Sequence, residues 1–269
     1  MPRRYNAFKA LLSKCRRVFT NFFFDPWDML KRWCGFHYFI HNAIAYTRRN
    51  SGHSFPISLR DLYYHSFDRF EPAGSVLIHY FLQDIWAARY VHDHHLTHVV
   101  DIGSRIDGYI SHLLTFCRVT YVDIRPLGIY VENLEFVSGD ITSLPFKDNS
   151  IGCLSSLHVL EHIGLGRYGD PVDPEGYLKA AKEIYRVLAP GGTFVLSTVV
   201  GQEKLCFDAH RIFDPSTVRT MFSKLMLEKF SLIDDAGEKV IENASFKDAK
   251  ACRYGCGIFI FIKPKGPLT

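Results

Sequence analysis

From residue 98 onward, short apolar runs alternate with segments of helical periodicity. Apolar runs that reach a polar or glycine residue lie at 98–103 (HVVDIG), 119–123 (VTYVD), 134–140 (LEFVSGD), 151–157 (IGCLSSL) and 193–200 (TFVLSTVV). Between them, 107–117 and 174–188 carry apolar residues at the three- and four-residue spacings of one helix face. Strands that alternate with helices are typical of a parallel sheet covered by helices.

The C-terminal part departs from this alternation. About twenty polar residues without helical periodicity separate the strand-like runs 229–234 (KFSLID) and 257–262 (GIFIFI). Two consecutive strands without a crossover helix must pair antiparallel. We therefore expect an α/β fold whose seven-stranded, mostly parallel sheet ends in an antiparallel hairpin.

Two later helices have clear start signals. Asp173-Pro174 and Asp214-Pro215 each place a capping carboxylate before a proline that suits a first helical turn. The first of these helices should end near Leu188, where Pro190-Gly191-Gly192 stops it.

The first 97 residues predict two further segments. Residues 1–53 read as a basic, aromatic-rich helical arm, with helical spacing for the apolar residues between Phe8 and Phe19. Residues 50–58 (NSGHSFPIS) have the composition of a linker. Residues 54–97 form a helical lead-in or lid, with the 3.6-residue period from Leu77 to Asp93. Residues 98–269 then make the sheet domain.

The net charge of +4 is unevenly distributed. Residues 1–49 hold ten Lys or Arg against Asp25 and Asp28, a net +8, which leaves −4 for the rest. An acidic body argues against nucleic acid as a partner, because nucleic-acid binding relies on cations at phosphates. The arm can instead lie on a membrane surface, pack on the domain, or contact a second copy of the chain.

The cysteines and the hydropathy indicate a cytoplasmic protein. The seven cysteines lack the paired short spacings of zinc sites and disulfide frameworks. Basic residues interrupt any early apolar run, which argues against a secretory signal. The uncharged stretch from Trp33 to Thr47 is too short to span a bilayer. We expect a protein that is cytoplasmic, with peripheral contact to the inner membrane face as an option.

Candidate nucleotide-binding residues follow the first three strands. In open α/β sheets, ligands bind outside the carboxyl ends of the strands. Gly103 allows a sharp turn, and Asp101 can accept from a cationic amino group. Asp123 offers two acceptor oxygens to two ribose hydroxyls. Asp140 and the amide of Ile141 can read an adenine edge. Each Asp alone can equally be a turn or helix cap.

These residues stand within longer motifs that resemble a known superfamily. DNSIGCLSSLHVLEHIG followed by EIYRVLAPGGTFVLST is similar to the class I S-adenosylmethionine (SAM)-dependent methyltransferases, near their ubiquinone-biosynthesis-like branch. DIGSRIDG, SSLHVLEHIGLGRYGD and CFDAHRIFDP, with DRFEPAGS upstream, resemble the family called domain of unknown function 268. The resemblance implies a Rossmann-like class I methyltransferase fold with SAM as cofactor.

The glycine-rich loop departs from the superfamily pattern. Its usual form is acidic-x-Gly-x-Gly-x-Gly, but here Arg105 and Asp107 replace the second and third glycines and Gly108 comes one place later. Arg105 either clamps the methionine carboxylate of SAM or crowds the site. The departure keeps a second interpretation open, a non-catalytic scaffold that has lost SAM binding. A nicotinamide-dependent oxidoreductase shares the Asp123 argument but conflicts with the terminal hairpin.

The segment after the fourth strand holds the candidate catalytic residues. His158 and His162 are four residues apart with Glu161 beside them, and a hydroxyl acceptor needs its proton taken. We assign His162 as the proton acceptor, although a structural role is as plausible for either His. The order HVLEH differs from the zinc-protease HExxH pattern, so no metal is expected.

Further polar residues can bind the acceptor. They are Arg167, Tyr168, Asp170 and Arg211, with His210 as an alternative base. Arg211 can hold an anion through its planar fork or tie down its own loop. By the resemblance, the expected reaction is O-methylation of a sugar or small-molecule acceptor linked to surface-polysaccharide biosynthesis.

Overall fold

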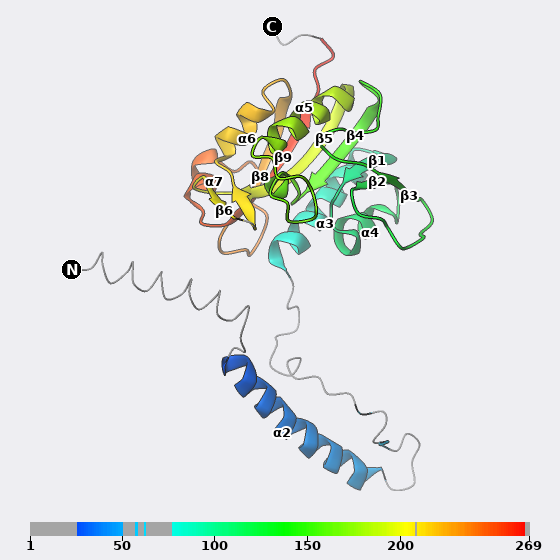
Figure 1. Cartoon of the computed structure of the whole chain (residues 1–269), viewed down its shortest axis with the longest axis vertical. Coiled ribbons are helices and arrows are strands. Elements are labelled where there is room, and N and C mark those ends of the chain that lie inside the picture. Colours follow the sequence, from blue (N-terminus) through cyan, green and yellow to red (C-terminus); the bar gives the residue numbers. More distant parts are fainter. Residues whose placement is uncertain (1–25, 51–56, 59–61, 63–76, 208, 267–269) are drawn as a thin grey trace, which may run out of the picture. The chain divides into compact units, whose positions relative to one another are not determined.

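The structure is a computed structural model that describes residues 26–50, 57, 58, 62, 77–207 and 209–266, with the backbone alone for 26–32 (Figure 1). The chain divides into two units, Met1–Ser75 and Val76–Thr269. In the first unit, the described helix is α2, Pro26–Arg49. The expected helix between Phe8 and Phe19 and most of the linker lie outside the described residues. None of the described helices is long and apolar enough to cross a membrane.

The second unit is built on a seven-stranded sheet with the order β3-β2-β1-β4-β5-β9-β8. Its strands are β1 (His98–Ile102), β2 (Arg118–Asp123), β3 (Leu134–Ser138), β4 (Ile151–Leu157), β5 (Leu188–Val200), β8 (Met226–Ile233) and β9 (Gly255–Ile262). β3, β2, β1, β4 and β5 run parallel, and β9 pairs antiparallel with both β5 and β8. The predicted mostly parallel sheet with a terminal antiparallel hairpin is confirmed.

Helices cover both faces of this sheet. The helical elements are α3 (Ile78–Asp93), η3 (Ile106–Ile110), α4 (Ser111–Leu113), η4 (Leu160–His162), α5 (Gly176–Val187), α6 (Pro215–Met221) and α7 (Phe246–Ala251). One core cluster joins residues of α5, α6 and α7 to the sheet, and a second joins α3, η3 and α4 to it. Phe194 belongs to the first cluster and Val195 to the second, because neighbouring strand residues point to opposite faces.

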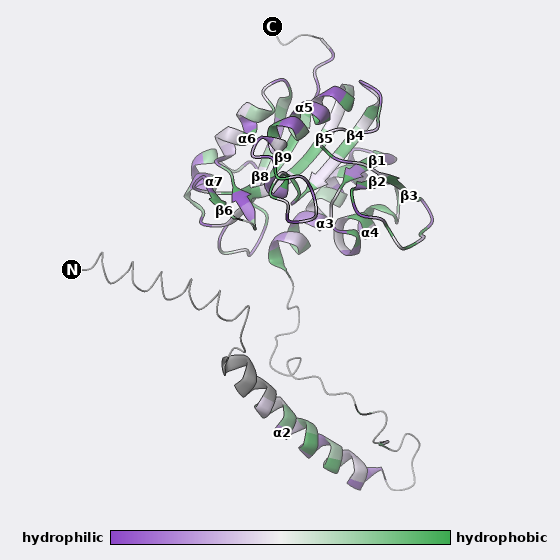
Figure 2. Cartoon of the chain, viewed as in Figure 1, coloured by the Kyte–Doolittle hydropathy of each residue, from purple (hydrophilic) through white to green (hydrophobic). Residues whose placement is uncertain are grey.

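The predicted amphipathic helices bury the expected faces. In α5 the buried residues include Ala180, Ala181, Ile184 and Val187, which recur with the helical period. Figure 2 shows hydrophobic and hydrophilic residues mixed along this helix. α6 begins as predicted, with the Asp214 side chain accepting from the Ser216 amide and Pro215 in the first turn.

Three local features differ from the expectation. The predicted helix 107–117 is instead the π-helix η3 followed by the short α4. η3 approaches α3 closely, because a Cβ on residue 108 would collide with Oδ2 of Asp84. α5 begins at Gly176 rather than directly after Asp173. The short α7 lies between the last two strands but leaves their antiparallel pairing intact.

α3 is an integral part of the sheet unit. Ala87, Tyr90 and Val91 on this helix are buried in the core cluster that α3 shares with β1 and β2. Burial of an aliphatic side chain such as that of Val91 stabilises the fold by about 1.5–3 kcal/mol. The C-terminal half of the predicted lead-in therefore belongs to the core, while the boundaries at 53 and 97 stay predictions.

Candidate functional site

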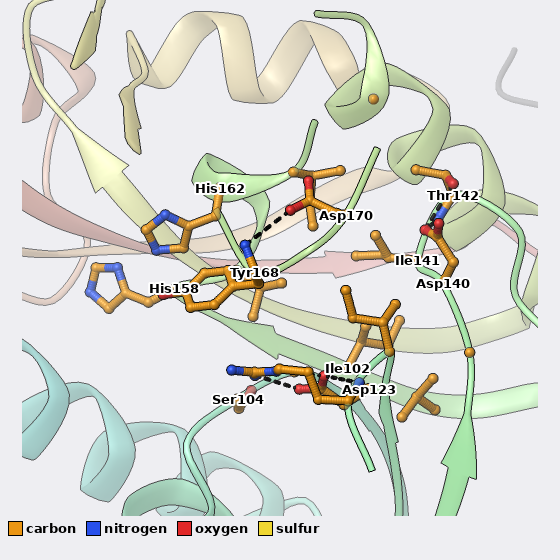
Figure 3. Close-up of a pocket in the computed structure, with 18 of the residues that line it drawn as sticks. Ile102, Ser104, Asp123, Asp140, Ile141, Thr142, His158, His162, Tyr168 and Asp170 are labelled. Carbon is orange, nitrogen blue, oxygen red and sulfur yellow. Dashed lines mark hydrogen bonds and ion pairs between the residues drawn. The ribbon is translucent and has the colours of Figure 1, made fainter. Parts of the chain in front are cut away.

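The carboxyl ends of the parallel strands surround a cavity of about 740 Å³. The segments that follow β1, β2, β3 and β4 line it, as the rule for open α/β sheets predicts. In Figure 3, Asp140 and Thr142 lie on one side of this cavity, His158 and His162 lie on the opposite side, and Asp123 lies below. The cavity thus joins the predicted nucleotide end to the predicted reaction end.

Asp101 lies behind the cavity rather than on it. Its carboxylate is fully buried and accepts from the amide and hydroxyl of Ser104 and from the hydroxyl of Ser155. Burial raises the pKa of Asp101 to about 7. In this arrangement Asp101 shapes the loop after β1, and the predicted contact with a cationic amino group stays a prediction.

Gly103 is the tight point of that loop. Its φ is +69°, a conformation that favours glycine, and a Cβ there would lie 3.2 Å from a methyl group of Val159. The residue lines the cavity, so its backbone can approach a ligand closely. This matches the role predicted for it, although the binding itself stays a prediction.

Arg105 lines the cavity with its guanidinium already paired. Its Nε and Nη2 donate to the two carboxylate oxygens of Asp107 at 3.0 and 2.6 Å. The same guanidinium lies 5.0 Å from the centroid of the Tyr80 ring. A carboxylate ligand at Arg105 would therefore either replace Asp107, the other residue that departs from the superfamily pattern, or use the Nη donors that Asp107 leaves free.

Asp123 also lies on the cavity, and its carboxylate is fully engaged. One oxygen accepts from the amide of Arg125 at 2.8 Å and from its Nε at 2.9 Å. The other accepts from Nη2 of Arg125 at 2.7 Å and from the Tyr121 hydroxyl at 3.1 Å. Burial acts in the opposite direction, but these donors hold the pKa of Asp123 below its usual value.

Asp140 and Ile141 occupy the nucleotide end of the cavity. One oxygen of Asp140 accepts from both the amide and the hydroxyl of Thr142 at 2.8 Å. This turn leaves the second oxygen of Asp140 for a donor in the cavity. Ile141 is buried and supplies an apolar wall beside it.

His158 and Glu161 form a buried pair. Nδ1 of His158 lies 2.6 Å from the Glu161 carboxylate, whose other oxygen accepts from the Thr198 hydroxyl. Burial alone would lower the pKa of His158, but Cys256 and the Glu161 carboxylate raise it well above its usual value. Glu161 is 1 % exposed and does not line the cavity, so His158 is the member of the pair that reaches the cavity.

His162 lines the cavity with a defined orientation. Its Nδ1 lies 2.7 Å from the backbone carbonyl of Ala209. Because a carbonyl only accepts, Nδ1 carries the proton, and in the neutral ring Nε2 is an acceptor. Burial lowers the pKa of His162, which favours that neutral ring near pH 7. A neutral ring with an accepting Nε2 is what a general base requires, and this role for His162 stays a prediction.

The residues after β5 support this arrangement from outside the cavity. β6 (Lys204–Cys206) and β7 (His210–Ile212) form a small hairpin. Arg167 donates to the same Ala209 carbonyl, and Arg211 donates to the carbonyl of Ile163. His210 packs edge-on against Tyr254 and lies behind His162. None of Arg167, His210 and Arg211 lines the cavity, so the geometry favours tying down loops over contact with the acceptor.

Asp170 organises the loop that carries Tyr168. One of its oxygens accepts from the amides of Gly164 and Gly166, and the other accepts from the Tyr168 amide. Tyr168 itself faces the cavity, and Figure 3 shows it between Asp123 and His162. Of the predicted acceptor residues, Arg167, Tyr168 and Asp170 share this loop and Arg211 lies on the β6–β7 hairpin, while Tyr168 and Asp170 line the cavity.

Several cavity residues escaped the sequence reasoning. Arg125 and Tyr80 both line the cavity, yet neither belongs to a recognisable motif. The sequence feature that could have pointed to Arg125 is its place two residues after Asp123, within reach of that carboxylate. The signal for Tyr80 is visible only once α3 packs against the sheet. Among the described residues, no group of three or more His, Cys, Asp or Glu side chains is arranged to hold a metal ion.

Comparison with known proteins agrees with this architecture. NodS, an N-methyltransferase from Bradyrhizobium japonicum whose structure holds S-adenosyl-L-homocysteine, superposes with a TM-score of 0.50 at 16% identity, over 83% of this chain and 99% of NodS. The chain has the fold of the class I SAM-dependent methyltransferases. The [4+2]-cyclase SpnF shares this methyltransferase fold, with a TM-score of 0.50 at 16% identity over 68% of this chain and 82% of SpnF.

The sequence comparisons agree with the methyltransferase fold. Residues 145–251 match the family described as "Caenorhabditis protein of unknown function, DUF268". Demethylmenaquinone methyltransferase from Staphylococcus epidermidis is 42% identical over 65 residues, 24% of this chain and 22% of that protein. The chain thus matches about a fifth of that relative's length. The resemblance to methyltransferases and to this family is confirmed.

Proposed function

We propose that the protein is a SAM-dependent methyltransferase that acts on a hydroxyl group. One observation carries the choice of a hydroxyl acceptor. The backbone carbonyl of Ala209 orients His162 so that its Nε2 is a proton acceptor on the cavity. A general base in that position suits an acceptor that must lose a proton as its oxygen reacts.

The cavity residues fit SAM as the cofactor. A volume of about 740 Å³ lies within the usual range for small-molecule sites. Gly103 admits close approach of a ligand to the backbone, Asp140 has a carboxylate oxygen left for a donor, and Ile141 adds an apolar wall. Bound SAM supplies a methyl group on a sulfonium leaving group.

The protein's own contribution is alignment and proton transfer. With SAM bound, the acceptor oxygen would bond to the methyl carbon as the carbon–sulfur bond breaks, and the electron pair of that carbon–sulfur bond would stay on sulfur, leaving a neutral thioether. The hydroxyl proton passes to Nε2 of His162, whose Nδ1–H keeps donating to the Ala209 carbonyl. Holding acceptor, methyl group and leaving group in line accounts for much of the rate.

For the acceptor class, we propose a sugar or another small hydroxyl compound used in surface-polysaccharide biosynthesis. Neutral hydrogen-bonding rings line the reaction end of the cavity, among them Tyr80, His162 and Tyr168. Such rings can stack on a sugar and hydrogen-bond to its hydroxyls. The polysaccharide link rests on the resemblance noted in the sequence.

A non-catalytic scaffold is the second candidate, and two ion pairs favour it. Arg105 is paired with Asp107, and Asp123 is saturated by Arg125 and Tyr121. SpnF is a cyclase of the same fold, so the architecture alone does not decide the reaction. Whether the protein is an enzyme or a scaffold, we propose that its N-terminal arm contacts a membrane surface or a second copy of the chain.

Calorimetric titration of the purified protein with SAM, and separately with NAD, tests the proposal. We expect SAM alone to bind, and Asp123→Ala to weaken that binding by roughly 1–3 kcal/mol, the scale of a lost charged hydrogen bond. Transfer of labelled methyl from SAM to candidate acceptors then identifies the acceptor. Absence of SAM binding would leave the scaffold as the function, and unchanged affinity in Asp123→Ala would remove the ribose assignment.

A further inference from the structure

The carboxylate of Asp123 has no acceptor position left for a ligand. A carboxylate offers about four lone-pair positions. Here each oxygen accepts two hydrogen bonds, three of the four donors belong to Arg125, and the fourth is the Tyr121 hydroxyl. Two ribose hydroxyls can therefore reach Asp123 only if the Arg125 side chain leaves it.

Arg125 also makes a cation–π contact with Tyr168, on the loop 163–170. Its guanidinium lies 4.8 Å from the centroid of the Tyr168 ring, and the guanidinium of Arg167 lies 5.2 Å from the same centroid. A guanidinium is attracted electrostatically to the face of an aromatic ring at such distances. One side chain thus connects the predicted ribose carboxylate with the predicted acceptor loop.

The Arg125 side chain is free enough to move. It is 53% exposed, while the Asp123 side chain is 7% exposed. An ion pair with one exposed partner is worth little, because water screens it and two long side chains must be held still. The Asp123 position is rigid, since it ends β2, whereas Arg125 lies in the loop beyond.

We propose that Arg125 is a positioning residue that competes with the ribose for Asp123 and releases Tyr168 when it is displaced. The inference rests on the proposed binding of SAM. The Arg125–Asp123 ion pair and the hydrogen bonds from the ribose to Asp123 exclude each other, because both use the same carboxylate oxygens. Cofactor binding is thereby coupled to the mobility of the acceptor loop, 163–170.

The first test measures affinity with and without the competing guanidinium. Arg125→Met keeps the apolar stem and removes the charge, and we expect it to bind SAM about two- to fivefold more tightly, the range set by a partly exposed ion pair. Arg118→Met, on the same strand but at its other, exposed end, serves as the matched control and should leave the affinity unchanged. The gain should disappear for the 2′,3′-dideoxy analogue of S-adenosylhomocysteine, which has no ribose hydroxyls. It should also disappear in the double variant Arg125→Met/Asp123→Ala.

The second test needs no cofactor. Hydrogen exchange of the amides in 163–170 should be faster in Arg125→Met than in the native protein, and Arg125→Lys, which cannot form the bidentate pair, should lie between them. Adding S-adenosylhomocysteine should speed this exchange in the native protein and leave Arg125→Met unchanged.

The two tests separate the competing explanations. If neither protein binds SAM, the proposed function fails, while exchange in the ligand-free proteins still decides whether Arg125 holds the loop. Weaker SAM binding in Arg125→Met, or an equal gain for the dideoxy analogue, would overturn the competition. Equal exchange of 163–170 in all variants would overturn the coupling to Tyr168.

Discussion

His158 and His162 are four residues apart, and their surroundings shift the pKa values of the two imidazoles in opposite directions. Nδ1 of His158 contacts the carboxylate of Glu161 at 2.6 Å, which favours the charged ring. Nδ1 of His162 donates to the Ala209 carbonyl, and burial favours the neutral ring. Pairs of titratable groups with diverging pKa values often mark an acid–base division of labour. This division fits our proposal that His162 is the base, with the His158–Glu161 pair as its support.

The role of His162 predicts a specific pH dependence. Since burial lowers the pKa of His162, the neutral base prevails at pH 7, and the rate should rise through a pKa below 6.5 and then level off. His162→Ala should retain SAM binding, lower turnover by about 10²–10⁴-fold and lose this rise. The pH–rate profile with the identified acceptor measures both. Normal turnover in His162→Ala, together with lost turnover in His210→Ala, would move the base to the hairpin after β5.

The loop after β1 predicts opposite effects for its two unusual residues. If Arg105 binds the methionine carboxylate of SAM, Arg105→Ala should weaken SAM binding, and Asp107→Ala should strengthen it because Asp107 now occupies the guanidinium. Neither variant should change the affinity for adenosine, which lacks the carboxylate. Calorimetry with both ligands measures the difference, and equal losses for SAM and adenosine would count against Arg105 as the clamp.

The buried His158–Glu161 pair predicts a stability window. The pKa of Glu161 is lowered, so its contribution is present above 4.5 and is lost as the pH falls through the folded value. The pKa of His158 is raised, so its contribution is present below 6.5 and is lost as the pH rises through its folded value. The pair should therefore stabilise most between these limits.

Removing one partner of the pair measures this contribution. Glu161→Gln should lower the free energy of unfolding by roughly 3–5 kcal/mol in that window, because it leaves a buried imidazolium unpaired, and by less at alkaline pH. Asp93→Asn is the control, since its pair with His92 is exposed and should contribute little. Urea unfolding at several pH values measures the loss of unfolding free energy in Glu161→Gln. An equal loss at every pH would argue against a charged pair.

The division of the chain predicts a separable arm. A protein that begins at Ser54 keeps α3 and the whole sheet, and we expect it to fold cooperatively and bind SAM with native affinity. A protein that begins at Leu96 lacks α3, whose Ala87 and Val91 are fully buried, and it should unfold or aggregate. Thermal unfolding and SAM titration compare the two. If the protein that begins at Ser54 does not fold, the arm belongs to the core, and the proposal that it contacts a membrane surface is wrong.

The sequence by itself determined the architecture and the position of the site. Strand runs and helix periodicity are local properties of the chain, so the parallel strands and the hairpin could be predicted before any contact was known. Asp123, Asp140 and His162 were found because side chains that follow parallel strands meet at one edge of the sheet.

Only the tertiary structure decided what each side chain does at that edge. The partners of Asp101 and Glu161 include Ser155 and Thr198, which lie on other strands, and no local pattern shows those contacts. Tyr80 reaches the cavity only because α3 packs on the sheet. The pairing of Arg125 with Asp123 is near in sequence, yet its meaning depends on Tyr168 across the cavity. Contacts between residues far apart in the sequence decide which side chains are hydrogen-bonded within the protein. Those contacts therefore separate the residues that face a ligand from the residues that hold the site in shape.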